Sequence, residues 1–418
     1  MIRRALLLVA IAQVACGAPD PAPGTGGTQI EAGACGRGVM VVETDYQSTN
    51  VSLIGWDGAV LSASFISSAS TSEGISAPLT VDVDVPTAMQ TGARVAVLDR
   101  YPAGVVTWAD VSSADVAAQL SLNVGDFQAN PQDYVEVRPG IAYVSRYNPN
   151  LGETAGTQPF DGGSDVAIVD VATPALVGTI DLAPAMEGED PSFHPRPNRI
   201  VATGDRAWVL LSGYSASFDA SAESRLVTID TATDSLIETT VLDGMHGCAG
   251  LALSPDRTQL AVACSGTFTS DQSSILAESG LVLLDLAGPK PLERTRIPAS
   301  ALGDGGLGFK IVFVDDDTVA FTLFGHDATA EAAALDDVLV AVDLQNGEVH
   351  ELLRSAGTPF TLGDIVCAPE CSTCIAADAE REGGVVHRFA VDGPSILHDR
   401  ALRVESTIGL PPRYLGRF

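Results

Sequence analysis

The sequence predicts an all-β fold, a seven-bladed β-propeller of four-stranded antiparallel blades, on three observations. An alternating apolar strand that ends in Asp recurs seven times at a mean spacing of about 56 residues; a hairpin lies upstream of most copies; and helical periodicity is nearly absent outside 328–335. Each unit therefore holds four short strands, as a propeller blade does. The clear copies end at Asp170, Asp230, Asp285 and Asp343, and weaker copies end at Asp57, Asp110 and Asp392.

Ring closure explains how one domain can hold so many residues. A lone four-stranded sheet has two exposed edges, whereas seven sheets packed around an axis bury their faces on one another and protect the edges. We therefore expect a propeller over residues 35–418 of the 418-residue chain. A signal peptide over 1–15 and a flexible tether over 16–34 are expected to precede it.

The predicted signal peptide begins with two arginines, and an apolar run follows that ends at Ala15. The run is too short to span a bilayer, which needs about 20 residues. Because Cys16 follows directly and a Pro- and Gly-rich stretch comes next, the segment resembles a bacterial lipoprotein signal, from which it departs at Gln13. The resemblance implies a lipidated Cys16 and an outer-membrane or cell-surface location. The alternatives are a plain secretory signal, which leaves a secreted or periplasmic protein, and a retained anchor.

The first and last segments of the predicted propeller complete one blade. The first unit lacks an innermost strand. It begins at 39–44 with a strand that matches the second strand of the other units. A spare segment at 407–417 follows the seventh unit and looks like the Pro-initiated innermost strands of the other units. We expect this C-terminal strand to join the first blade and close the ring.

Six cysteines follow Cys16, and an even number in an exported chain indicates disulfides. The hairpin register of two units sets two pairs of cysteines opposite each other, and the remaining pair lies at neighbouring turns of the first and seventh blades. The predicted disulfides are Cys248 with Cys264, Cys367 with Cys374, and Cys35 with Cys371. Spacing alone leaves all fifteen pairings of six cysteines open.

Three short motifs carry a resemblance to a known repeat family. They are Tyr143-Val-Ser-Arg146, Ile229-Asp-Thr-Ala-Thr-Asp234 and Ser254-Pro-Asp-Arg257. The units resemble the bacterial YVTN-type β-propeller repeats, with overlap to the LVIVD-type surface repeats. The resemblance implies the propeller fold and, much less specifically, an exported protein with a binding or structural role.

The composition excludes some classes of partner. The chain has 23 Lys and Arg against 53 Asp and Glu, a formal net charge of −30 at pH 7. Because nucleic acids and anionic lipids are bound through Lys and Arg, this charge argues against both. We expect a monomer that binds a protein or a cell-surface component and meets the membrane only through its lipid anchor.

The long loops of the predicted propeller are acidic and share one face. They join the second and third strands of a blade, or one blade to the next. Because loops held by a rigid scaffold carry binding sites, we predict the binding face there. The opposing interpretation is that long polar loops are tolerated without a function. The candidate residues are Asp161, Asp165, Glu189, Asp190, His194, Asp243, His246, His326 and Asp327.

We predict no cofactor, and two metal sites are the alternatives on this face. Asp161 and Asp165 offer oxygen ligands to Ca²⁺ from a Gly-containing loop. His194, His246 and Asp190 would form a metal site if they converged. The alternative interpretations are that Asp161 and Asp165 belong to an ordinary turn and that His194 and His246 are structural residues at loop ends. The aspartates that end the third strands recur in every unit, which indicates a turn-stabilising role.

The sequence has no GxSxG, HExxH or P-loop motif, and no GxGxxG between a strand and a helix. We therefore predict a non-enzymatic binding or scaffold propeller. The alternative is a metal-dependent, lactonase-like hydrolase at the channel mouth, which needs three or more convergent Asp, Glu or His side chains. A purely structural surface protein is the third hypothesis.

Overall fold

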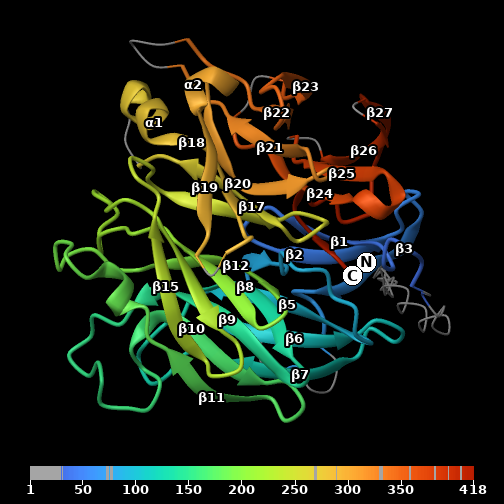
Figure 1. Ribbon diagram of the computed structural model, residues 1–418. Helices are drawn as coiled ribbons and strands as arrows, with labels where there is room; N and C mark the ends of the chain where they lie inside the picture. Colours follow the sequence, from blue (N-terminus) through green and yellow to red (C-terminus); the bar gives the residue numbers. More distant parts are fainter. Residues whose placement is uncertain are drawn as a thin grey trace, which may run out of the picture.

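The computed structural model describes residues 30, 32–71, 75, 79–267, 271–288, 290–328, 333–356, 359–380, 383–393, 395–404 and 407–418. Within these ranges the chain forms seven four-stranded antiparallel sheets, arranged as the blades of a propeller (Figure 1). The predicted fold class is confirmed. The predicted signal peptide, Cys16 and most of the tether lie outside the described residues.

Each blade has four strands, named A to D here from the central channel outwards. In this order the strands are β28 (Pro412–Arg417), β1 (Val39–Thr44), β2 (Thr49–Ile54) and β3 (Val60–Ser67) in blade 1; β4 (Asp82–Asp84), β5 (Arg94–Tyr101), β6 (Val105–Asp110) and β7 (Val116–Ser121) in blade 2; β8 (Pro131–Arg138), β9 (Ile141–Pro149), β10 (Gly163–Asp170) and β11 (Ala175–Ile180) in blade 3; β12 (Pro197–Thr203), β13 (Arg206–Leu211), β14 (Arg225–Asp230) and β15 (Ser235–Val241) in blade 4; β16 (Cys248–Leu253), β17 (Gln259–Ser265), β18 (Ser279–Asp285) and β19 (Leu292–Pro298) in blade 5; β20 (Gly306–Phe313), β21 (Thr318–Phe324), β22 (Val338–Asp343) and β23 (Val349–Arg354) in blade 6; and β24 (Leu362–Ala368), β25 (Thr373–Asp378), β26 (Val385–Asp392) and β27 (Ser395–Leu402) in blade 7.

Short helical segments lie between strands: η1 (Ala183–Met186), α1 (Gln272–Glu278), α2 (Ala299–Leu302) and η2 (Pro369–Cys371). Helix α1 begins where the side chain of Asp271 accepts a hydrogen bond from the backbone N–H of Ser273. The stretch with helical periodicity, 328–335, falls partly on residues outside the described ranges. On its described flanks, His326 and Leu335 form an isolated antiparallel bridge.

The C-terminal strand closes the ring as predicted. Strand β28 pairs antiparallel with β1, with Val39 opposite Arg417. Its buried Leu415 and the terminal Phe418 enter the cores on the two sides of blade 1. The last residues of the chain therefore supply the innermost strand of the first blade.

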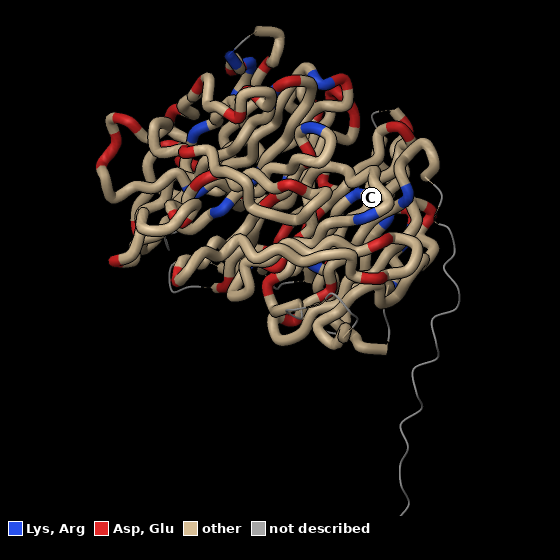
Figure 2. Tube along the Cα trace, turned by 90° about the horizontal axis from the view of Figure 1, so that it is seen from below, with Lys and Arg blue, Asp and Glu red and all other residues tan. Residues whose placement is uncertain are grey.

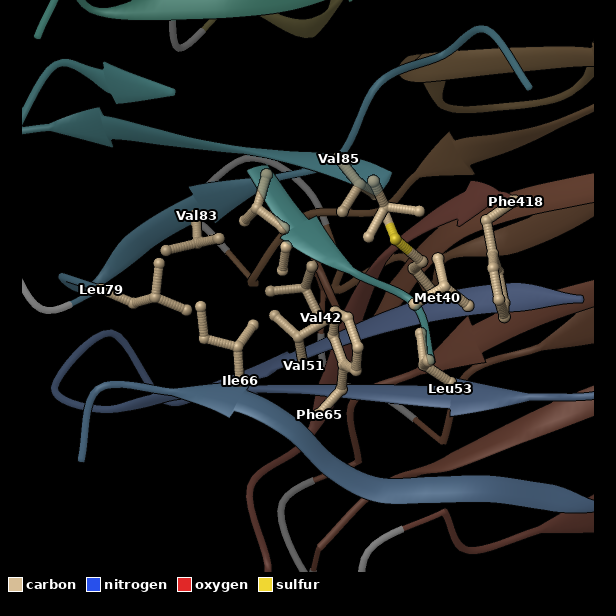
Figure 3. Close-up of a cluster of buried hydrophobic side chains, with 14 of the residues drawn as sticks. Met40, Val42, Val51, Leu53, Phe65, Ile66, Leu79, Val83, Val85 and Phe418 are labelled. Atoms are coloured by element: carbon tan, nitrogen blue, oxygen red, sulfur yellow. The ribbon is translucent and has the colours of Figure 1, made fainter. Parts of the chain in front are cut away.

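One apolar cluster fills each interface between neighbouring blades in the described part of the chain. Strand β1 shows how: Met40 and Val42 enter the cluster shared with blade 2, whereas Val39 and Val41 enter the cluster shared with blade 7. Figure 3 shows the first of these clusters, with Met40 near Val85, the residue after β4. Inner strands are thus buried on both faces, which explains their nearly continuous apolar sequences.

Three disulfides join the described cysteines in the predicted pairs. Cys248 with Cys264 links β16 to β17, Cys367 with Cys374 links β24 to β25, and Cys35 with Cys371 links the segment before β1 to η2. Such bonds persist in oxidising compartments and indicate an exported protein. No helix among the described residues is long and apolar enough to cross a membrane.

The aspartates that end the C strands stabilise the following turns. The carboxylate of Asp230 accepts hydrogen bonds from the backbone N–H groups of Ala232 and Thr233, both at 2.9 Å. These bonds to the charged form lower the pKa of Asp230. Equivalent pairs of bonds confirm the predicted role at Asp110, Asp170 and Asp343.

Candidate functional site

A cavity of about 310 Å³ lies at the mouth of the central channel. Tyr46, which follows β1, lines it from the B–C loop of blade 1, and Phe360 lines it from the segment before β24. Tyr214 adds a wall from the B–C loop of blade 4. The cavity therefore opens on the face of B–C and blade-connecting loops, where the sequence predicts binding. We call it the channel pocket.

One position of the A strands supplies part of the channel pocket, since Arg199, Lys310, Asp364 and Tyr414 line it. In each blade the residue at this position directly precedes a buried apolar or aromatic residue. An ion pair can join the side chains at this position from one blade to another, as it does for Arg199 and Asp84. Charged residues at five of the seven positions make the channel polar although the blades are apolar. The seven residues are Asp84, Asp133, Arg199, Gly250, Lys310, Asp364 and Tyr414.

Ion pairs organise the charged residues at this position. Asp84, which is fully buried, contacts Arg199 of blade 4 at 3.1 Å and Arg100 of β5 at 3.2 Å. On the other side, Nζ of Lys310 donates to Asp364 at 3.0 Å and to the carbonyl oxygen of Leu415 at 2.7 Å. Because buried charges are costly unless paired, these contacts fix each cation in one place.

Asp84 and Asp133 respond to their surroundings in opposite ways. Burial acts to raise the pKa of Asp84, but attraction to Arg199, Arg100 and Lys310 outweighs it, so the pKa is lowered. For Asp133 burial prevails over Arg199 and the backbone N–H donors, and its pKa is raised. Asp84 is therefore the ionised partner that holds the two arginines.

Arg199 has an unused donor. Its Nη1 donates to Asp84 at 3.1 Å and to the carbonyl oxygen of Gln132 at 3.0 Å. Its Nε is buried and has no hydrogen-bond partner among the described residues. An unsatisfied buried donor costs about 1–3 kcal/mol, and Arg199 carries this donor in the lining of the channel pocket.

Aromatic side chains form the walls of the channel pocket. Phe324 packs against Phe309 and Phe360, with ring centroids 5.1 and 4.9 Å away, and the Arg413 guanidinium lies 4.8 Å above the ring of Tyr46. Burial raises the pKa of Tyr147 to about 12, so its phenol stays protonated at neutral pH. The pocket thus combines cationic and phenolic donors with flat apolar faces. Its aromatic lining is Tyr46, Tyr147, Tyr214, Phe309, Phe324, Phe360 and Tyr414.

The predicted acidic residues are absent from the described lining of the channel pocket. Asp161 is buried and accepts hydrogen bonds from the backbone N–H groups of Gly156, Thr157 and Gln158 at 3.0–3.1 Å. Asp165 is buried against Arg146, whose Nε donates to it at 2.7 Å. Both carboxylates hold their own loops in place.

Other predicted residues of this face also have local partners. Glu189 pairs with Arg225, and a carboxylate oxygen of Asp190 accepts from the backbone N–H of Ser192 at 2.8 Å. The carbonyl oxygen of Asp243 accepts from Arg296. The carboxylates of Asp190 and Asp243 remain exposed, as does that of Asp327. Asp and Glu are spread over loops all around the chain trace (Figure 2).

The predicted histidines are held by neighbours in the loops. Nδ1 of His246 is 2.9 Å from Oγ of Ser221, and Nδ1 of His326 is 2.9 Å from the carbonyl oxygen of Asp327. Burial, with a smaller contribution from Arg196, lowers the pKa of His194. Within the described ranges no three His, Cys, Asp or Glu side chains gather as metal ligands.

Sequence reasoning missed the cations of the channel. A usable signal exists: Lys310 is one of two lysines in the whole chain, and it interrupts an apolar strand. Arg199 directly precedes the apolar run of the corresponding strand of blade 4. Aligning the A strands on the residue before their apolar run would have placed both in one ring.

No protein-family model and no curated protein sequence matches the chain. Solved structures do. The Pseudomonas aeruginosa periplasmic gluconolactonase PpgL is similar over 90% of this chain and 97% of its own, with a TM-score of 0.53 and 15% identity. A Bacteroides fragilis protein provisionally assigned as a 6-phosphogluconolactonase covers 90% of this chain and 96% of its own, with a TM-score of 0.54 and 11% identity. A Lactobacillus plantarum protein covers 90% and 98%, with a TM-score of 0.56 and 13% identity. At these identities the likeness extends to the fold: the chain is a seven-bladed β-propeller similar to those of gluconolactonase-like proteins.

Proposed function

We propose that this protein is a non-enzymatic binding propeller of the cell envelope, anchored through a lipidated Cys16, which captures a small sugar acid in the channel pocket. The observation that carries the proposal is the buried Nε of Arg199, which has no hydrogen-bond partner among the described residues, in the lining of a pocket walled by aromatic rings. The anchor rests on the lipoprotein-like signal in the sequence.

The donors of the pocket favour an anion. Arginine forms strong, directional hydrogen bonds with carboxylates and phosphates. Arg413 donates to the carbonyl oxygens of Thr44 and Phe360, at 3.0 and 3.3 Å, and so stands at the pocket without a bonded carboxylate among the described residues. An acid group on the ligand would therefore meet Arg199 below and Arg413 at the rim.

The walls and the volume of the pocket favour a molecule of the size of one sugar. About 310 Å³ lies at the lower end of ligand sites, which supports a ligand of monosaccharide size. Aromatic faces pack well on the C–H groups of a sugar, whether it is a ring or an open chain, and protonated phenols donate to its hydroxyl groups. The name of one structural neighbour, a gluconolactonase, points to a related chemistry, because opening that lactone yields a sugar acid.

Binding without turnover is proposed because the described lining offers no free base. Its one carboxylate, Asp364, is bonded to Lys310 at 3.0 Å and to the backbone N–H of Leu415 at 3.1 Å. A hydrolase would need a carboxylate or histidine able to take a proton from water. A protein or cell-surface component remains the proposed partner of the acidic loops around the pocket.

Calorimetric titration tests the ligand class. D-gluconate and D-glucuronate should bind, and D-glucose should bind at least about tenfold more weakly. Arg413→Gln should weaken acid binding by about tenfold, because it removes a rim cation. Arg400→Gln is the matched control, since Arg400 is exposed on β27 of blade 7. Equal affinity for glucose and the acids would overturn the proposed class.

Two further measurements test the rest of the proposal. Incubation with glucono-δ-lactone should show no rate above the spontaneous hydrolysis; clear catalysis would overturn the non-enzymatic part. Intact mass of the protein purified from its native host should fit a diacylated Cys16. A free mature N-terminus would overturn the anchor.

A further inference from the structure

A second cavity of about 530 Å³ lies beside the channel pocket, and we call it the lateral pocket. It is built by the segment between β7 and β8, by the end of β9 with the loop that follows it, and by the B–C loop of blade 4. Its lining mixes polar side chains with apolar faces. The residues used below are Asp126, Asn148, Leu151, Glu153, Arg196 and Phe218.

The two pockets share one wall. Tyr147 lines the channel pocket, and the next residue of β9, Asn148, lines the lateral pocket. The ring of Tyr147 stacks on that of Phe218, with centroids 6.2 Å apart and planes at 8°. The guanidinium of Arg196 lies over both rings, 4.1 Å from the centroid of Phe218 and 5.2 Å from that of Tyr147. A single layer of side chains therefore separates the cavities.

Arg196 keeps this wall in place. It is buried, and its Nε and Nη2 donate to the carbonyl oxygens of Tyr214 and Ser215, at 3.3 and 2.9 Å. Arg196 precedes the start of β12, and Arg199 is three residues further along the chain.

The chemistry of the lateral pocket favours an uncharged polar group. Asn148, Asp126 and Glu153 offer amide and carboxylate oxygens that accept hydrogen bonds from hydroxyl groups. Phe218 and the exposed Leu151 offer apolar faces. A second acid group would face Asp126 and Glu153, on a chain whose net charge is −30. Hydroxyl groups on a ring match this set, and a second anion does not.

We propose that the lateral pocket is a second subsite for the same ligand, and that the ligand is an acidic oligosaccharide with one terminal acid unit and a neutral sugar joined to it. Both pockets are lined by loops of the same face, so the acid unit occupies the channel pocket and the neutral sugar reaches the lateral pocket over the edge of the shared wall, beside Phe218. The proposal rests on the proposed sugar-acid function of the channel pocket.

Two probes that share an acid unit test the subsite. D-gluconate carries the acid alone, whereas lactobionate is gluconate with a neutral galactose attached. Titration calorimetry should give lactobionate a Kd at least about tenfold lower than that of gluconate. In Phe218→Ala and Glu153→Gln the Kd of gluconate divided by the Kd of lactobionate should fall towards one. Leu397→Ala, an exposed outer residue of β27, is the matched control and should keep the wild-type ratio.

The outcomes separate the two proposals. If gluconate binds and lactobionate binds no better, the subsite is overturned while the sugar-acid function stands. If neither probe binds, the proposed function fails and the subsite fails with it. If a disaccharide with an acid on both units binds more tightly than lactobionate, the lateral pocket takes an anion and the neutral-sugar assignment is wrong. Thermal melts establish whether both variants are folded. If Phe218→Ala does not fold, the Kd ratio of Glu153→Gln alone tests the subsite.

Discussion

Cys35 and Cys371 are joined by a disulfide although 336 residues separate them in the sequence. The bond ties the segment that enters blade 1 to the A–B turn of blade 7. Strand β28 closes the same seam by pairing with β1. The first and last blades are therefore held together twice, once covalently and once by backbone hydrogen bonds.

Removing the seam disulfide should destabilise the protein more than removing a hairpin disulfide. Cys35→Ala with Cys371→Ala opens a loop of 336 residues, whereas Cys367→Ala with Cys374→Ala opens one of 7. In the chain-entropy model the longer loop contributes about 3–3.5 kcal/mol more to the free energy of unfolding. Urea unfolding of both double variants measures the difference. Equal losses would contradict the role assigned to the seam.

Truncation after Glu405 should abolish cooperative unfolding. The deletion removes β28, leaves β1 with an unpaired edge and takes the buried Leu415 and Phe418 out of two cores. Circular dichroism melts of the full and truncated proteins test this, with Ile408→Ala as a control for changes in the same segment. A truncated protein that melts like the full-length one would refute the closure.

The carboxyl group of Asp99 should make stability depend on pH. Burial raises its pKa to about 6, although Thr80 donates to it through its backbone N–H and its hydroxyl. Because the folded pKa lies above the unfolded value of about 3.9, the stabilisation is complete below about pH 4 and is lost as the pH rises through 6. Relative to Asp99→Asn, the wild type should therefore lose about 3 kcal/mol between pH 3.5 and pH 7. A difference that stays constant over this range would show that Asp99 titrates normally.

Breaking the buried pair of Asp84 and Arg199 should cost more than removing both charges. Arg199→Met leaves Asp84 with one arginine in a dry site and is expected to cost about 3–5 kcal/mol. Adding Asp84→Asn should restore at least about 1 kcal/mol, because the uncompensated charge is gone. Denaturant unfolding of the two single variants and the double variant completes the cycle. Additive losses would mean that the pair is not coupled.

Calcium should leave the melting temperature unchanged. Asp161 is occupied by three backbone N–H groups and Asp165 by Arg146, so neither carboxylate is open to the ion. Melts in 1 mM EDTA and in excess CaCl₂ should agree within about 1 °C. A rise of several degrees with calcium would revive the calcium site considered from the sequence.

The fold was predictable because its signals are local and repeated. The strand, Asp and turn pattern recurs in each blade, and the hairpin register alone sets Cys248 opposite Cys264. The channel pocket was not predictable in this way, because its lining takes single residues from strands about 50 residues apart in the chain. Asp161 and Asp165 misled for a related reason: a loop carboxylate bound to its own loop has the same sequence signature as a free one.

The position of Cys35 shows at which end the chain enters the propeller. Strand β1 starts just after Cys35 and ends just before Tyr46, which lines the channel pocket, and its 6 residues span about 20 Å. Under the proposed lipid anchor at Cys16, the chain would enter the propeller at the end opposite its pocket. A net charge of −30 would also repel anionic head groups. The proposed anchor therefore leaves the pocket open to a ligand that arrives from the aqueous side.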